Sequence, residues 1–282
     1  MTIQQALSSS GIDPREARLL LAAASGFSEA SVLAHTERVL PLEIQRSFEL
    51  MAARRKGGEP VAYILGRKEF YGLELAVNPA VLIPRPETEL VVEIALEKNF
   101  SSVVDLGTGS GAIALALKKH RPKARVIAVE ASAAALAVAQ RNAAKYSLEI
   151  DLRHGRWLEA VAGERFDLIV ANPPYVAADD PHLHDLSFEP RSALVAGADG
   201  LDAIREIAAV APAHLSPGGW LFLEHGMGQD GAVRALLADA GLEELTTWPD
   251  LAGIPRVSAG RRKNGALWRA VTTRWSQRKL VA

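Results

Sequence analysis

The sequence predicts an α/β protein, in which a mostly parallel sheet with helices on both faces follows a small helical domain. Two observations support this fold class. After Leu90, apolar runs typical of buried strands alternate with helical patterns, which favours parallel strands joined by crossover helices. Before about residue 58, the apolar residues instead recur at helical spacing. A chain of 282 residues is long enough for both parts.

The first part, residues 1–58, predicts a helical domain. Residues 14–25 begin with a proline that directly follows Asp13, a suitable N-cap residue. Apolar side chains then fall on one helix face, at Ala17, Leu20, Leu21 and Ala24. Residues 40–58 predict a further helix, which ends at a glycine pair.

Between the two parts, in residues 59–84, the spacing of the apolar residues changes toward a period of two. Gly66 and Gly72 stand at the positions of turn residues. We therefore expect a β-hairpin that links the helical domain to the larger domain, residues 85–262.

The larger domain predicts strands and helices in turn. Strands are expected within residues 102–111, 124–130, 148–154, 166–175, 219–226 and 242–248. Helices are expected within residues 112–120, 131–146, 200–215 and 230–241. Ligands of such sheets bind beyond the carboxyl ends of the strands, so the loops that follow the strands are the candidate site.

The composition excludes several classes of function. The chain has no cysteine, which excludes disulfides, thiol nucleophiles and cysteine-bound zinc. A net charge of −1 is not that of a general nucleic-acid binder. The basic tail, residues 263–282, fits either a solvated segment or a weak contact with RNA or an acidic partner. Without a secretory signal or an apolar run of about 20 residues, we expect a cytoplasmic protein with no membrane span.

A glycine turn lies between the first expected strand and helix of the larger domain. In "DLGTGSGA", Gly107, Gly109 and Gly111 permit a tight turn in which a ligand approaches bare backbone. The pattern alone also fits a dinucleotide fingerprint. Glu130, at the end of the next strand, is placed to accept hydrogen bonds from both hydroxyls of a ribose. Asp105 directs a second carboxylate at the same crevice, which suits the ammonium and sulfonium of S-adenosylmethionine better than a pyrophosphate.

The fourth strand of the series ends in "NPPY", which comprises Asn172, Pro173, Pro174 and Tyr175. If S-adenosylmethionine lies over the glycine turn, its methyl group is near this strand end. The side-chain oxygen of Asn172 and the carbonyl of Pro173 can then accept both hydrogens of a planar NH₂ group and aim its nitrogen at the methyl. Tyr175 can lie against the planar group and fix its tilt. The motif predicts methyl transfer to an amide or aromatic NH₂.

With these motifs, the sequence resembles the release-factor glutamine methyltransferases of the PrmC/HemK type over nearly the whole chain. Further stretches typical of that family are "GEPVAYILGRKEFYGL", "VLIPRPETE", "DPHLHDLSFEPRSALVAGADGL", "GGWLFLEHG" and "RVSAGR". The resemblance implies a Rossmann-like class I S-adenosylmethionine-dependent methyltransferase sheet of seven strands, with a final antiparallel hairpin. It also implies that the helical domain docks a peptide-chain release factor. The side-chain amide N5 of the glutamine in the GGQ motif of that factor would be methylated, and S-adenosylhomocysteine would be the product.

The resemblance also assigns roles to single residues. The cofactor would be held by Asp105, Gly107, Thr108, Gly109, Ser110, Gly111, Glu130, Trp157 and Asn172. Trp157 would lie beside the adenine, and Asn172 to Tyr175 would bind the glutamine. Arg156 is a departure, because family members commonly have an acid at that position. The contact to the adenine amino group is therefore left open.

Several alternatives remain at this stage. The prolines of "IPRPETE" fit either a helix start or a place near the cofactor. His182 and His184 fit a solvated loop better than a metal site, so no metal is expected. A methyltransferase acting on adenine N6 or guanine N2 of nucleic acid, a nicotinamide oxidoreductase and a non-catalytic translation factor are the competing functions. We expect a monomer without membrane or stable nucleic-acid binding.

Overall fold

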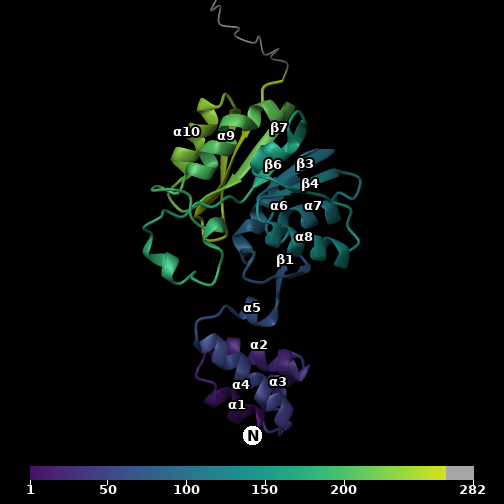
Figure 1. Ribbon diagram of the computed structural model, residues 1–282, viewed down its shortest axis with the longest axis vertical. Coiled ribbons are helices and arrows are strands. Elements are labelled where there is room, and N and C mark those ends of the chain that lie inside the picture. The colour runs from purple at the N-terminus through teal and green to yellow at the C-terminus, as the bar shows by residue number, and fades with distance from the viewer. Residues whose placement is uncertain (265–282) are drawn as a thin grey trace, which may run out of the picture.

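The computed structural model describes residues 1–264, so most of the predicted basic tail, residues 265–282, lies outside the described residues. Residues 1–65 hold the helices α1 (Ile3–Ser9), α2 (Pro14–Ser25), α3 (Glu29–Ala34), α4 (Leu42–Lys56) and α5 (Val61–Leu65). Figure 1 shows this bundle below the larger domain, with α5 and β1 between them. The start of α2 is confirmed, because the Asp13 carboxylate accepts hydrogen bonds from the amides of Arg15 and Glu16. The bundle closes around a core that includes Ile3, Leu20, Leu21 and Phe48.

The predicted hairpin is shorter than residues 59–84. Only β1 (Arg67–Phe70) and β2 (Leu73–Ala76) pair, in antiparallel register. The expectation of a two-residue period was wrong for Val61–Leu65, which forms α5. Val61, Ile64 and Leu65 are spaced as one helix face, and all three pack into the core of the bundle. Tyr63 points the other way and packs against residues of the larger domain, so α5 connects the two cores.

One sheet of seven strands forms the centre of residues 85–264. The strands are β3 (Ser102–Leu106), β4 (Arg125–Glu130), β5 (Asp151–His154), β6 (Phe166–Ala171), β7 (Leu215–Glu224), β8 (Glu243–Pro249) and β9 (Pro255–Arg261). Their order in space is β5-β4-β3-β6-β7-β9-β8. β3 to β7 pair in parallel, whereas β9 runs antiparallel to both β7 and β8. The predicted α/β sheet and its final antiparallel hairpin are confirmed.

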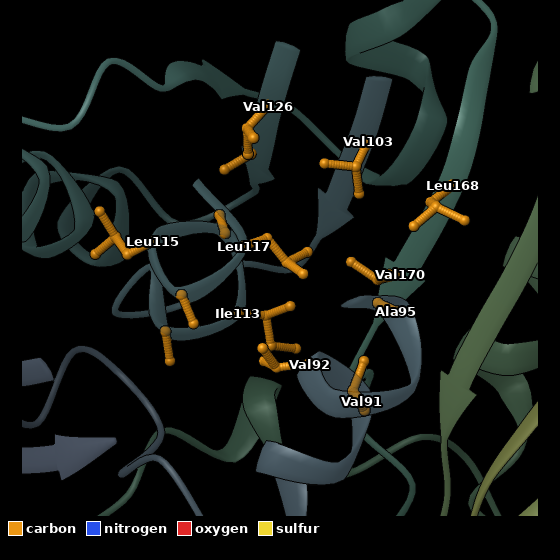
Figure 2. Close-up of a cluster of buried hydrophobic side chains, with 14 of the residues drawn as sticks. Val91, Val92, Ala95, Val103, Ile113, Leu115, Leu117, Val126, Leu168 and Val170 are labelled. Carbon is orange, nitrogen blue, oxygen red and sulfur yellow. The ribbon is translucent and has the colours of Figure 1, made fainter. Parts of the chain in front are cut away.

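Helices cover both faces of this sheet. They are α6 (Glu89–Leu96), α7 (Ala112–His120), α8 (Ala133–Lys145), α9 (Asp202–His214) and α10 (Asp230–Asp239). Figure 2 shows the core on one face, where Val91, Ile113 and Leu117 meet Val103 and Leu168 of the strands. The neighbour of Val103, Val104, belongs to the core on the other face, under α9 and α10. Successive strand residues are thus buried on opposite faces, as in a parallel sheet covered twice.

The hairpin is fastened to the larger domain by the buried side chain of Asn142 on α8. Its amide accepts a hydrogen bond from the Ala76 amide over 2.7 Å and donates to the Ala76 carbonyl. It also donates to the Ser110 carbonyl in the glycine turn over 2.8 Å. One buried amide therefore joins β2 to the turn that follows β3. Within residues 1–264, no helix is long and apolar enough to cross a membrane.

Candidate active site

A cavity of about 590 Å³ lies beyond the carboxyl ends of β3, β4 and β6. Its floor is the glycine turn, and its walls come from loops distant in the sequence. The residues that line it include Val81, Gly107, Gly109, Glu130, Ser132, Arg156, Trp157, Asn172, Pro174, Val195 and Glu206. The cavity lies where the sequence placed the candidate site, at the strand ends of a parallel sheet.

The glycines of the turn have positive φ angles, which other residues adopt only with strain. Gly107 has φ +71°, and a Cβ at this position would lie 3.2 Å from the Trp157 ring. The missing side chain lets the indole rest directly on the turn. Thr108 and Ser110 are buried and do not line the cavity. Their predicted contribution to ligand binding is therefore through the backbone of the turn.

Glu130 ends β4 and faces the cavity, as predicted. One carboxylate oxygen accepts a hydrogen bond from the Gly109 amide, and the other accepts one from the Ser132 amide, both over 2.9 Å. These two bonds fix the carboxylate between the glycine turn and the start of α8. Each oxygen keeps acceptor capacity, so the group can also bind two hydroxyls.

Asp105 lies elsewhere than expected. Its carboxyl group is buried beneath the glycine turn and does not line the cavity. One oxygen accepts hydrogen bonds from the Thr108 hydroxyl over 2.6 Å and from the Ala114 amide over 3.2 Å. The other oxygen has no partner among the described residues. Burial raises the pKa of Asp105 to about 7, although the bonds from Thr108 and Ala114 oppose that rise.

Trp157 lines the cavity and follows β5, whereas Asn172 follows β6, on the other side of β4 and β3 in the sheet. Its backbone is left-handed, with φ +46°, a strained conformation for a bulky residue. The indole N–H donates to the Glu206 carboxylate on α9 over 2.9 Å. Arg156 donates to both oxygens of the same carboxylate. The arginine that departs from the family pattern therefore holds a carboxylate from another helix at the edge of the cavity.

The "NPPY" segment leaves β6 at the opposite side of the cavity. Asn172 and Pro174 line the cavity, whereas Pro173 and Tyr175 do not. The Asn172 amide nitrogen donates to the Thr88 hydroxyl over 3.0 Å. This bond leaves the side-chain oxygen of Asn172 available as an acceptor, as the sequence predicted.

The backbone of Tyr175 is contacted by two loops, the one before α9 and the one after β7. Its carbonyl accepts a hydrogen bond from the Gln229 side chain over 3.0 Å. Gly200, with φ +76°, lies so close that a Cβ there would collide with the same carbonyl. The phenol oxygen lies 3.4 Å from Oε1 of Glu224, at the end of β7. Burial and the Glu224 charge raise the pKa of Tyr175, so its hydroxyl stays a donor.

The sequence did not single out three residues that contact the predicted site residues. They are Thr88, Glu206 and Glu224. Thr88 lies within the "IPRPETE" segment, which was left between two interpretations. Its contact with Asn172 now favours the functional one. Glu206 and Glu224 have no local signal, because each acts on residues about 50 positions away in the chain.

The "HLH" histidines lie on a short 3-10 helix, Pro181–His184, away from the cavity. His182 contacts only Asp180 among acidic residues of the described chain, and its side chain is exposed. Residues 1–264 contain no group of three or more His, Cys, Asp or Glu side chains placed to hold a metal ion.

Comparison with known proteins extends this description. Residues 2–66 match the PrmC N-terminal domain, and residues 86–187 match the Methyltransferase small domain. A release factor glutamine methyltransferase of Xylella fastidiosa is 50% identical over 257 residues, which cover 89% of this chain and 94% of that protein. One from Pseudomonas aeruginosa is 50% identical over 252 residues, with 87% and 91% covered. The chain belongs to the release factor glutamine methyltransferase family.

Membership of this family makes the chain an S-adenosylmethionine-dependent methyltransferase, so the predicted enzyme class and cofactor are confirmed. The fold recurs in a Pyrococcus furiosus methyltransferase, which is 18% identical with a TM-score of 0.55 and covers 75% of this chain and 97% of that one. A T. thermophilus 16S rRNA methyltransferase in complex with AdoMet and guanosine is 25% identical with a TM-score of 0.53, and the match covers 70% of this chain and 50% of that one. These two structures support the fold.

Proposed function

We propose that the chain methylates the side-chain amide N5 of the glutamine in the GGQ motif of peptide-chain release factors. The observation that carries this proposal is the Asn172 amide, which is anchored on Thr88 and leaves its oxygen available at the cavity. A primary amide is planar and its lone pair is delocalised, so it is a weak nucleophile that must be oriented. Asn172 supplies a hydrogen-bond acceptor for that purpose.

A second acceptor is the Pro173 carbonyl. Within residues 1–264 it accepts no backbone hydrogen bond. With Asn172, it can hold both hydrogens of the glutamine NH₂ and direct the nitrogen lone pair at the methyl group. Tyr175 does not line the cavity, and it supports the stiff segment through its anchored carbonyl.

The cavity fits S-adenosylmethionine, which supplies an already activated methyl group. Glu130 is fixed by two amides and can bind the ribose hydroxyls. Trp157 and Glu206 present an aromatic face and an acceptor at one end of the cavity, where they would contact the adenine. Asp105 lies beneath the glycine turn and not in the cavity; when it is ionised, its partnerless oxygen gives a negative charge there, which favours the positive ammonium and sulfonium.

The helical domain is the proposed docking module. It carries exposed apolar side chains at Leu33, Val39, Leu42 and Leu50. Such side chains are typical of a surface that meets a protein partner. The nearly neutral net charge supports a protein substrate over nucleic acid. We further propose that the chain acts as a cytoplasmic monomer without stable nucleic-acid binding.

The test is transfer of a labelled methyl group from S-adenosylmethionine to purified release factor, with bulk RNA and DNA as rival acceptors. We expect label on the factor and none on a factor whose GGQ glutamine is replaced by alanine. Labelling of either nucleic acid in preference to the release factor would contradict the proposal. Equal labelling of the glutamine-free factor would reject the assigned acceptor atom.

A further inference from the structure

Glu189 is a buried carboxylate in the loop between β6 and α9, within the stretch "FEPRSAL". Its side chain is only 3% exposed. One carboxylate oxygen accepts a hydrogen bond from the Ile83 amide over 2.9 Å, and the other accepts one from the Arg85 guanidinium. These two donors replace the water that burial removes from the carboxylate. The contacts join the loop to residues 106 and 104 positions earlier in the chain.

The two segments that Glu189 joins both line the cavity. Ile83 directly follows residues 80–82, which form a first wall of the cavity. Glu189 directly precedes Pro190, where a second wall begins that continues to Gly197. Glu189 itself does not line the cavity. Its carboxylate therefore connects two walls of the cavity without contacting what is bound between them.

Each wall is also fastened to another part of the molecule. In the first wall, the Val81 carbonyl accepts a hydrogen bond from the Tyr63 hydroxyl of α5 over 2.5 Å. In the second wall, the Ala196 amide donates to the Val176 carbonyl, just after "NPPY", over 3.0 Å. Within residues 1–264, the hydrogen bonds between residues 80–85 and 189–197 are those of Glu189 alone. Loss of its carboxylate therefore removes the hydrogen bonds that hold the walls to each other.

The contact joins stiff points of the backbone. Ile83, Arg85 and Glu189 each directly precede a proline. A residue before proline is restricted to extended backbone, and Arg85 is extended, with φ −95° and ψ 144°. Because Glu189 is coupled so rigidly to Pro190, the position of its carboxylate fixes where the second wall begins.

We propose that Glu189 is a positioning residue, which holds the two walls at the spacing that S-adenosylmethionine binding requires. The cofactor follows from the family, so the inference does not depend on which acceptor is methylated. Walls that are already in place do not have to be ordered when the cofactor binds, which strengthens binding. The role also connects two stretches of the sequence, because "VLIPRPETE" supplies the donors and "FEPRSAL" supplies the carboxylate.

The test is calorimetric titration of full-length protein with S-adenosylmethionine and S-adenosylhomocysteine. Glu189→Gln keeps the size of the side chain, but its single oxygen cannot serve both donors as the carboxylate does. We expect its affinity for both ligands to be about tenfold lower than that of the wild type. Glu16→Gln is the matched control, because it breaks a partly buried pair with Arg55 inside the helical bundle. It should bind as the wild type does.

Variants of Arg85 separate the contact from the carboxylate itself. Arg85→Met removes the cation and should weaken cofactor binding about as much as Glu189→Gln. The double variant should bind no more weakly than Glu189→Gln alone, because both changes remove the same contact. Arg85→Lys keeps a positive donor and should recover most of the affinity that Arg85→Met loses.

A second measurement uses the protein without cofactor. Amide hydrogen exchange in Glu189→Gln should become faster in residues 191–197 and stay unchanged in β3 and β4, whose pairing does not involve the walls. Exchange that rises equally in β3 and β4 would show a general loss of stability and would overturn the proposal. Wild-type affinity in Glu189→Gln would also overturn it. If Glu189→Gln does not fold, wild-type affinity in Arg85→Met overturns it.

Discussion

The Glu130 carboxylate accepts a hydrogen bond from the Gly109 amide over 2.9 Å, and this contact joins the end of β4 to the glycine turn after β3. A second bond, from the Ser132 amide, fixes the other oxygen. The carboxylate is therefore oriented before any ligand arrives, and binding does not have to order it. Such preorganisation favours tight recognition of the two ribose hydroxyls.

Glu130→Ala should weaken S-adenosylmethionine binding about ten- to hundredfold. Two hydrogen bonds to a charged group contribute about 1.5–3 kcal/mol, which corresponds to that range. The measurement is calorimetric titration with S-adenosylmethionine and S-adenosylhomocysteine. Glu149→Ala, an exposed acid before β5, is the matched control and should bind normally. An unchanged dissociation constant for Glu130→Ala would show that the residue only joins the end of β4 to the neighbouring loops.

Glu206→Ala should lower affinity about tenfold by removing the acceptor that Arg156 and Trp157 hold at the edge of the cavity. The informative comparison is S-adenosylhomocysteine with S-inosylhomocysteine, which has an oxygen in place of the adenine amino group. The wild type should prefer the amino form, and the variant should lose that preference. Glu159→Ala, an exposed acid two positions after Trp157, should keep it. If Glu206→Ala keeps the full preference, the carboxylate only supports the indole.

Asn172→Ala should reduce turnover about 10²–10³-fold with little change in cofactor affinity. The variant loses an oriented acceptor, an effect comparable with the loss of an oxyanion-hole donor. Asn172→Asp keeps an acceptor oxygen and should retain partial activity. Single-turnover labelling of release factor at saturating cofactor separates the two effects. Methylation by Asn172→Ala at the wild-type rate would disprove the acceptor role.

Asp105→Asn should make the protein more stable at pH 8, by on the order of 1–2 kcal/mol. The pKa of the buried carboxyl is about 7, whereas an unfolded aspartate titrates near 3.9. The folded state therefore binds the proton more tightly, and stability decreases as the pH rises from about 4 to about 7. The asparagine variant lacks this loss, so its advantage should shrink at pH 5. Urea unfolding at both pH values is the measurement.

The same substitution should weaken cofactor binding, since it removes the negative charge beneath the glycine turn. Asp239→Asn, at the exposed end of α10, should change neither property. A gain in stability without a loss in affinity would mean that Asp105 only supports the turn through Thr108 and Ala114.

Removal of residues 1–58 should abolish methylation of whole release factor and leave cofactor binding intact. The cut precedes α5, whose Tyr63 belongs to one buried cluster with Val81 of the linker and with Ala135 and Val138 on α8 of the larger domain. The shortened protein therefore keeps the contacts that support the cavity. Labelling assays and calorimetric titration on the same preparation are the measurements. A shortened protein that methylates the factor at the full rate would reject the docking role.

The sequence by itself determined the α/β class, six of the seven strands of the sheet in their order, and the glycine turn and "NPPY" segment that border the cavity. Local patterns were sufficient for these features. Buried strands are continuous apolar runs, and Asp13 caps α2 through contacts two and three residues away. Glycine permits the positive φ angles of the turn, and proline restricts the backbone of "NPPY", so the role of both is visible without neighbours.

Only the tertiary structure decided how α5 folds and what holds the site residues. α5 is helical because one face of it completes the core of the bundle, a contact that a five-residue window does not contain. Asp105 is buried under the turn because α7 closes over it, although its position next to the glycines suggested an exposed carboxylate. Thr88, Glu206 and Glu224 reach Asn172, Trp157 and Tyr175 across 84, 49 and 49 positions of chain. Contacts between residues so distant in sequence arise only when the sheet brings its strand ends together, which is why the supporting residues had no local signal.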